Sequence, residues 1–317
     1  MIATAVLVLT ALAFAWSMGA HYTGACMGMP YATRSISLRP ALALMAVMTL
    51  IGASLLSGRV LTHVGEGLVT GPLHVVPAII VIGIAFVLTT VFTQLRIPTS
   101  TIQILVFTLI GTALPLGLGV DWRAILDLGV LWVLAPAVAC ALGFLFTRAF
   151  DLVPGLNARG AASLIGQALV AVGAIASLTM GANDVSNATA VFLSVHFSGP
   201  LLAGIVGGVG LAMGVLTWGR PLLERVAFDV VKMDLKMATA AQLVQALVVL
   251  IAVGFGYFTS MNQALIGAMA GTGLARDRRT IETRVIVGIA RGWIIGPGAG
   301  FIAAYAAARV YQAVSGG

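Results

Sequence analysis

Residues 161–187 read AASLIGQALVAVGAIASLTMGANDVSN, an apolar run that ends in a cluster of small polar side chains around one carboxylate. The apolar part, Ala161–Met180, has the length that an α-helix needs to cross a bilayer, which is about 20 residues. Inside hydrocarbon only helices and closed barrels satisfy their own backbone hydrogen bonds, and the sequence lacks the alternating pattern of barrel strands. The stretch therefore predicts a transmembrane helix that carries a polar site.

Apolar runs of similar length recur along the chain. They are Ile2–Ala20, Pro40–Leu56, Val75–Phe92, Leu126–Phe146, Gly199–Trp218, Met237–Gly256 and Val285–Ala308. Two further segments, Pro98–Leu118 and Thr259–Leu274, are interrupted by glycine and open with small polar residues, which predicts re-entrant hairpins rather than full spans. No basic stretch precedes the first run, so we expect it to be retained as a span and not cleaved as a signal peptide.

The composition agrees with an all-α polytopic membrane protein. Of 317 residues, 60% are hydrophobic and 9% are charged, whereas soluble domains carry about 25% charged residues. The formal net charge of +7 comes from basic residues scattered in short loops, which is typical of membrane proteins and not of nucleic-acid binding. Cys26 and Cys140 form neither a disulfide framework nor a zinc-ligand spacing. We therefore expect a multi-pass protein of the cell membrane, with the lipid bilayer as its surroundings and no nucleic-acid partner.

The two halves of the chain repeat each other at a spacing of about 160 residues. The matches include Met18-Gly19-Ala20 with Met180-Gly181-Ala182, Thr99-Ser100 with Thr259-Ser260, Gly111-Thr112 with Gly271-Thr272, and Trp132…Pro136 with Trp293…Pro297. We therefore predict a first membrane repeat over residues 1–150, a linker over 151–160 and a second repeat over 161–317. Two inverted repeats need an odd number of crossings each, and the apolar runs give an even number. We expect the missing element in Gly19–Ile36.

Asp184 is the only permanently ionisable side chain between Ala161 and Gly219. A carboxylate at membrane depth costs about 2.5–3.5 kcal/mol, so its presence indicates a function. Asn183 and Asn187 lie next to it on a helix, and amide and carboxylate oxygens are hard ligands that suit Na⁺. The Asp184 carboxyl is equally able to carry a proton, which leaves H⁺ as the other candidate coupling ion. The alternative is a helix cap, a common role for Asn and Asp after glycine.

The run GANDVSNA, together with the two interrupted segments, resembles the inorganic phosphate transporter (PiT) family, whose hallmarks are a GANDxAN motif in each half and a serine- and threonine-rich hairpin. Pro98-Thr-Ser-Thr-Ile-Gln103 and Thr259-Ser-Met-Asn-Gln263 resemble that hairpin. The first-half motif departs from the pattern, because it reads Gly19-Ala-His21-Tyr22-Thr23-Gly24-Ala25 and has Tyr22 in place of the aspartate. This departure, with the following Met27-Gly28…Tyr31, is similar to the bacterial sulfate permease branch. The resemblance also implies a homodimer.

The two interrupted segments supply the predicted anion site. Helices that start at Ser100-Thr101 and at Ser260 would direct free backbone N–H groups and their positive dipole ends into the protein, an arrangement that suits a tetrahedral oxyanion. The alternative is that the serines and threonines only cap these helices. The predicted anion-binding residues are Thr99, Ser100, Thr101, Gln103, Thr259, Ser260, Asn262 and Gln263.

Duplicated membrane proteins with interrupted segments at matching positions are typically secondary transporters that bind substrate near the bilayer midplane. We therefore predict a symporter of an inorganic oxyanion, driven by H⁺ or Na⁺ through Asp184. Sulfate is favoured because Tyr22 removes an acceptor for the hydrogens of phosphate; the alternative is a low-affinity inorganic phosphate transporter, and a passive anion channel is a third reading. The sequence contains no HExxH motif, carboxylate pair or His/Cys cluster, so we expect no enzyme, no catalytic residue and no cofactor besides the coupling ion. Membrane orientation and the roles of His21 and Arg291 stay open at this point.

Overall fold

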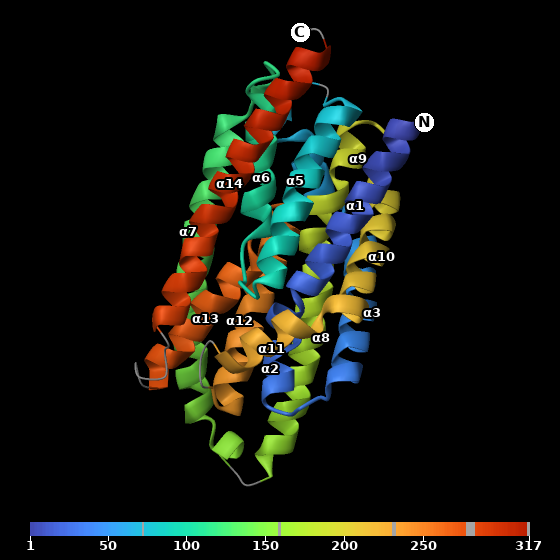
Figure 1. Ribbon diagram of the computed structural model, residues 1–317. Helices are drawn as coiled ribbons and strands as arrows, with labels where there is room; N and C mark the ends of the chain where they lie inside the picture. The colour runs from blue at the N-terminus through green and yellow to red at the C-terminus, as the bar shows by residue number, and fades with distance from the viewer. Residues whose placement is uncertain (72, 158–159, 230–232, 277–282, 316–317) are drawn as a thin grey trace.

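The computed structural model describes all residues except 72, 158–159, 230–232, 277–282 and 316–317, and the described residues are almost entirely helical (Figure 1). The first half contains α1 (Ile2–His21), α2 (Thr23–Ala32), α3 (Leu38–Leu55), α4 (Gly58–Glu66), α5 (Val75–Gln94), α6 (Thr101–Ala113) and α7 (Trp122–Leu152). The second half contains α8 (Ala161–Thr189), α9 (Val191–Ser194), α10 (Pro200–Trp218), α11 (Arg220–Asp229), α12 (Leu235–Gly254), α13 (Met261–Arg276) and α14 (Thr283–Ser315). A short 3₁₀ helix, η1 (Pro154–Asn157), joins the halves within the predicted linker 151–160, of which 158–159 lie outside the described residues. The only sheet in the described part of the chain pairs β1 (Val69–Thr70) with β2 (Gly119–Val120) in antiparallel register.

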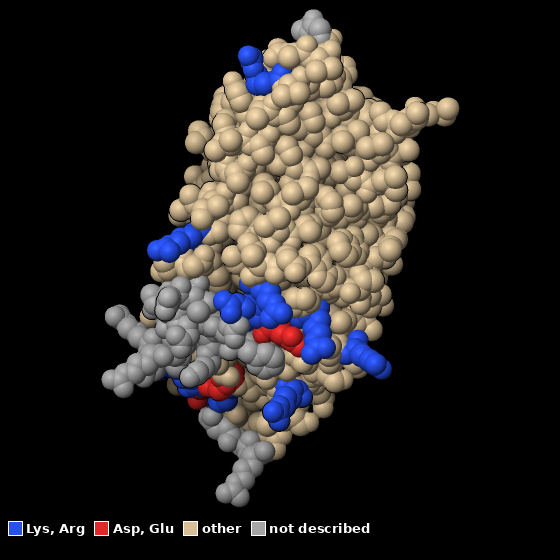
Figure 2. Space-filling view, in the orientation of Figure 1, with Lys and Arg blue, Asp and Glu red and all other residues tan. Residues whose placement is uncertain are grey.

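Eight helical stretches in the described residues are long and apolar enough to cross a membrane, one for each long apolar run found in the sequence. Many large hydrophobic side chains on these helices are exposed, as expected for surfaces that face lipid. Figure 2 shows a broad band almost free of charged side chains, with a small basic group above it and most of the visible acidic and basic residues below it. The all-helical multi-span architecture predicted from the sequence is therefore confirmed.

The element expected in Gly19–Ile36 is α2. Helix α1 continues to His21 and the chain then breaks at Tyr22, which has φ −94° and ψ 1°, before it resumes as α2. The two helices together form one candidate span, Ile2–Ala32.

The two interrupted segments do not fold back on themselves as predicted. Each forms a short non-helical tip followed by one helix, α6 of 13 residues or α13 of 16 residues. At 1.5 Å per residue these are single rods of about 20–24 Å, too short to contain both arms of a hairpin. Each tip is preceded by a longer helix, α5 or α12. Figure 1 shows α5 and α6 in the upper half and α12 and α13 in the lower half, with both connecting tips near the centre.

The helix packing follows the sequence repeat. Helix α1 packs on α10 while α8 packs on α3, and α6 packs on α14 while α13 packs on α7. The closest contacts are exchanged in the same way: a Cβ on Gly19 would lie 1.9 Å from the carbonyl oxygen of Leu211, and a Cβ on Gly181 would lie 2.0 Å from that of Thr49. Glycine at these positions lets the helix backbones touch, as is common inside membranes. The packing supports the duplication, whereas the inverted orientation and the repeat boundaries stay predictions.

The close contact at Gly181 gives the first prediction. Gly181→Ala introduces a methyl group where the Thr49 carbonyl lies, so we expect the free energy of unfolding to fall by about 1–3 kcal/mol, seen as a lower melting temperature in detergent. The control is Gly129→Ala in α7, where no atom lies within 4 Å of the new Cβ and the melting temperature should hold or rise. Equal melting temperatures for Gly181→Ala and the wild type would contradict the packing described here.

Candidate ion and anion site at two helix tips

The tips that precede α6 and α13 meet at the centre of the molecule. The side-chain amide of Asn262 donates to the carbonyl oxygen of Thr99 at 2.8 Å, and the amide of Gln263 donates to Oε1 of Gln103 at 3.2 Å. These bonds join residues that are far apart in the sequence. The structure therefore brings together the two segments that were predicted to form one anion site, and the predicted anion-binding side chains are all buried.

Both serines cap their helices. Ser100 Oγ accepts from the backbone N–H of Gln103 at 3.4 Å, and Ser260 Oγ accepts from that of Gln263 at 3.3 Å. Capping was the alternative to anion binding, and the two roles are compatible. A serine hydroxyl that accepts from the backbone still has its own proton to donate, and a cap satisfies only one of the free N–H groups in the first turn.

Asn183 holds the second tip by a pair of hydrogen bonds. Its Nδ2 donates to the Thr259 carbonyl at 2.8 Å, and its Oδ1 accepts from the Thr259 N–H at 3.0 Å. Asn183 was predicted as a ligand of the coupling ion. In this structure both polar atoms of its side chain bind the tip backbone, so it positions the tip.

His21 holds the first tip at the position that corresponds to Asn183. The Thr93 hydroxyl donates its only proton to the Thr89 carbonyl at 2.8 Å. Thr93 Oγ1 also lies 2.8 Å from His21 Nδ1, and because it has no second proton it must accept a hydrogen bond from that nitrogen. The other ring nitrogen, Nε2, then has a free lone pair and accepts the backbone N–H of Thr99 at 3.1 Å. A histidine therefore takes over the tip-positioning role that an asparagine has in the second half.

Asp184 lies beside the joined tips and is fully buried. Asn187 Nδ2 donates to Asp184 Oδ1 at 3.4 Å and to Thr101 Oγ1 at 3.1 Å, and the Tyr22 hydroxyl lies 2.7 Å from the same Thr101 oxygen and also contacts the Asp184 carboxyl. Thr101, predicted as an anion ligand, therefore belongs to the Asp184 group. Helix α8 continues without interruption to Thr189, so Asp184 and its two asparagines lie inside a helix and the helix-cap alternative is wrong.

Several oxygens of this cluster have no hydrogen-bond partner among the described residues. They are Asp184 Oδ2, Asn187 Oδ1, Thr259 Oγ1 and Gln263 Oε1. An unsatisfied buried acceptor costs about 1–3 kcal/mol, so four in one region indicate groups that a ligand completes. Carboxylate, amide and hydroxyl oxygens fit a hard monovalent cation such as Na⁺, and a carboxylate with a free oxygen also fits a proton.

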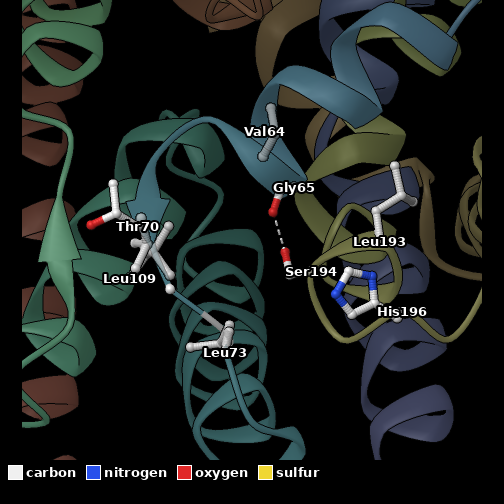
Figure 3. Close-up of a pocket in the computed structure, with 10 residues that line it drawn as sticks. Val64, Gly65, Thr70, Leu73, Leu109, Leu193, Ser194 and His196 are labelled. Carbon is white, nitrogen blue, oxygen red and sulfur yellow. Dashed lines mark hydrogen bonds between the residues drawn. The ribbon is translucent and has the colours of Figure 1, made fainter.

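A cavity leads from the surface toward this cluster. Its outer part has a volume of about 370 Å³ and is lined by residues of α4, β1, α6 and α9 and of the loops that follow β1 and α9, among them Thr70, Ser194 and His196 (Figure 3). The Ser194 hydroxyl donates to the Gly65 carbonyl across this cavity. A narrower space of about 30 Å³ continues inward between apolar side chains to Asn187. It has room for a water molecule and not for an oxyanion, so the route is constricted at its inner end.

The sequence matches the Phosphate transporter family over residues 18–304. The chain belongs to this family. A protein of Mycobacterium bovis named "Probable low-affinity inorganic phosphate transporter" is 28% identical over 95% of this chain and 76% of its own length, and one of Mycobacterium leprae with the same name is 27% identical over 92% and 73%. A solved structure titled "The sodium-dependent phosphate transporter" has the same fold, with a TM-score of 0.91, 18% identity and coverage of 99% of this chain and 100% of that one.

Membership of the phosphate transporter family, with the eight apolar helical stretches, makes the chain a multi-pass membrane protein. The family and the named relatives are transporters, in line with the expectation of no enzyme. They give no support to the sulfate preference, and the alternative reading, phosphate, has the support of the comparisons.

Two residues of the cluster, His21 and Tyr22, were not among the predicted site residues. The signal that could have identified them is the repeat itself, because they align with Asn183 and Asp184. Arg291, whose role was open, is an exposed residue of α14.

The tip-positioning role of His21 gives the second prediction. His21→Ala leaves the buried Thr99 N–H without an acceptor, and we expect it to lower the free energy of unfolding by about 1–3 kcal/mol. His21→Asn copies the residue of the second half and should retain most of the melting temperature. If His21→Ala melts at the wild-type temperature, the hydrogen bond to the tip is unimportant.

Proposed function

We propose that this chain is an Na⁺-coupled symporter of inorganic phosphate that binds the anion between the tips of α6 and α13. The observation that carries the proposal is the buried Asp184 carboxyl, with one oxygen unpartnered, beside two helix tips that are hydrogen-bonded to each other. A helix N-terminus attracts anions through its free N–H groups and its dipole, and two of them face one region here. The same region also contains uncharged polar side chains that can bind the anion, namely those of Ser100, Ser260, Gln103, Asn262 and Gln263.

Phosphate suits this site better than sulfate for a chemical reason. Near neutral pH, phosphate retains at least one hydrogen that it can donate, whereas sulfate has none. Asp184 Oδ2 and Gln263 Oε1 are unpartnered acceptors in the same region. Uncharged donors also release the anion more readily than a cluster of arginines, as transport requires.

Asp184, Asn187 and Thr101 are the side chains that would hold the cation. The solved relative of the same fold is titled sodium-dependent, which favours Na⁺ over H⁺. Their counterparts in the other half are Tyr22, Ala25 and Met261, none of which offers a comparable set of oxygen ligands. We therefore propose a single cation site of this kind, in the second half only.

Alternating access would use the two halves, residues 1–150 and 161–317, as inverted repeats. Helix α6 runs back toward the end of the molecule from which α5 starts, so this pair does not add a crossing to its half (Figure 1). This arrangement supports an odd number of crossings per repeat, with α5–α6 and α12–α13 as the proposed re-entrant hairpins. The homodimer implied by the family resemblance is kept as part of the proposal.

Uptake into proteoliposomes tests the function. We expect saturable uptake of radiolabelled phosphate that needs an inward Na⁺ gradient, responds weakly to a proton gradient, and is inhibited little by excess sulfate. A single cation site predicts a hyperbolic dependence of uptake on Na⁺ concentration, with a Hill coefficient near 1. Uptake driven only by a proton gradient would mean that Asp184 binds H⁺ and not Na⁺ as the coupling ion. Phosphate flux that does not saturate would identify a channel.

Asp184→Asn tests the cation site directly. It removes the charge that balances the cation, so we expect the Na⁺ concentration for half-maximal uptake to rise at least tenfold, which corresponds to about 1.4 kcal/mol of binding. Asp121→Asn is the matched control, because Asp121 caps α7 at an exposed position and asparagine caps equally well. Unchanged Na⁺ dependence in Asp184→Asn would remove Asp184 from the coupling site.

A further inference from the structure

Two glutamines on α12, Gln242 and Gln245, form a buried polar pair outside the cluster described above, and both are 0% exposed. Gln242 Nε2 donates to the carbonyl oxygen of Ala25 at 2.8 Å and to Gln245 Oε1 at 2.7 Å. A carbonyl can only accept, so Ala25 fixes the orientation of the first amide, and that amide fixes the second. Within the part of the chain that the structure describes, Gln242 Oε1 and Gln245 Nε2 have no hydrogen-bond partner. A pair of amide N–H donors is therefore held, unused, in the interior.

The repeat shows where this pair lies relative to the transport route. Helices α5 and α12 have the same length, 20 residues, and Gln242 and Gln245 of α12 correspond to Ile82 and Ala85 of α5. Ile82 lines the narrow inner space that reaches Asn187. Ala25, which Gln242 contacts, is the counterpart of Asn187. Gln242 therefore occupies, in the second half, a position whose first-half counterpart lines the route to the tips, and Gln245 lies about one helical turn further along α12.

The corresponding positions of the second half are more tightly packed in this structure. The first route is lined by Leu105 and Leu109 of α6, and their counterparts in α13, Leu265 and Met269, are 1% and 0% exposed. The two routes also differ in chemistry, because Ile82 and Ala85 are apolar and the glutamines are polar. An unpartnered amide is unfavourable in a sealed interior and becomes favourable when water or an anion reaches it.

We infer that Gln242 and Gln245 form a passage site for the anion on the route opposite the cavity of Figure 3. The inference rests on the proposed function. When the second route opens, the Gln245 NH₂ group donates to the phosphate that leaves or enters the tips. A neutral donor lowers the barrier for an anion in an apolar passage without trapping it. The site affects the rate of transport and leaves binding at the tips unchanged.

The test separates turnover from binding. Gln245→Leu removes the donor at similar size, and Gln245→Glu replaces the NH₂ group by an oxygen with little change in shape. We expect both to reduce the maximal rate of phosphate uptake in proteoliposomes at least tenfold, while the phosphate concentration that half-maximally raises the melting temperature of the purified protein stays within twofold. Without phosphate, Gln245→Leu removes an unsatisfied NH₂ group but also the oxygen that accepts from Gln242, so we expect its melting temperature to stay near or somewhat below that of the wild type, whereas Gln245→Glu retains that acceptor.

Two controls complete the design. Gln167→Leu changes an exposed glutamine of α8 and should leave uptake as in the wild type. The double variant Gln242→Ile, Gln245→Ala copies the residues that α5 packs at the same positions, and it serves if a single variant fails to fold; it too should bind phosphate and transport it slowly.

The outcomes distinguish this inference from the proposed function. If the wild type takes up no phosphate, both are overturned. If the wild type transports and the variants match its rate, only the passage site is overturned. Variants that lose phosphate binding and melting temperature together with uptake would assign the pair a structural role and overturn the passage site as well.

Discussion

The structure depends on the need to satisfy polar backbone where no water reaches it. Two non-helical tips lie at the centre of a bundle of apolar helices, and their N–H and C=O groups have no partners within their own helices. The Asn262 amide binds the Thr99 carbonyl, Asn183 binds both backbone groups of Thr259, and His21 accepts the Thr99 N–H. Each tip is held by a side chain from α1 or α8. The hydrogen bonds that satisfy the buried backbone groups of the tips therefore also fix the position of the candidate site.

The two halves share the same helix packing but differ in their polar side chains. Glycines at matching positions bring α1 against α10 and α8 against α3 through equivalent contacts. The polar positions have diverged: Tyr22 stands at the position equivalent to Asp184, and Ile82 at the position equivalent to Gln242. Because the two halves have similar helix packing, the protein has two structurally related routes to the tips. The side chains along the two routes differ, so the routes differ in chemistry.

Much of this was predictable from the chain. The eight apolar runs predicted the eight helical stretches that are long and apolar enough to cross a membrane, since a run of about 20 apolar residues favours a helix in the bilayer. The repeat predicted that Ser100 and Ser260 belong to one region. The pairing of α5 with α6 was not predicted, because a helix of 20 apolar residues has the same composition whether it crosses or turns back at a tip. The placement of Thr101 with Asp184, and not with the other tip hydroxyls, was also missed, since Asn187 and Tyr22 approach it from other helices.

By itself the sequence determined that this chain lies in a membrane and that it is built from two similar halves, and it predicted a function for the one carboxylate in a long apolar stretch. These conclusions rest on hydrophobicity, repetition and the cost of burying charge, which are properties of local sequence. Only the tertiary structure decided which atoms are used and which are left free. Both polar atoms of the Asn183 side chain form hydrogen bonds with a tip. Among the described residues, one oxygen each of Asp184 and Asn187 and the NH₂ group of Gln245 have no hydrogen-bond partner. A hydrogen-bonding group is satisfied or free according to what lies within about 3 Å of it, and here those neighbours come from helices remote in the chain.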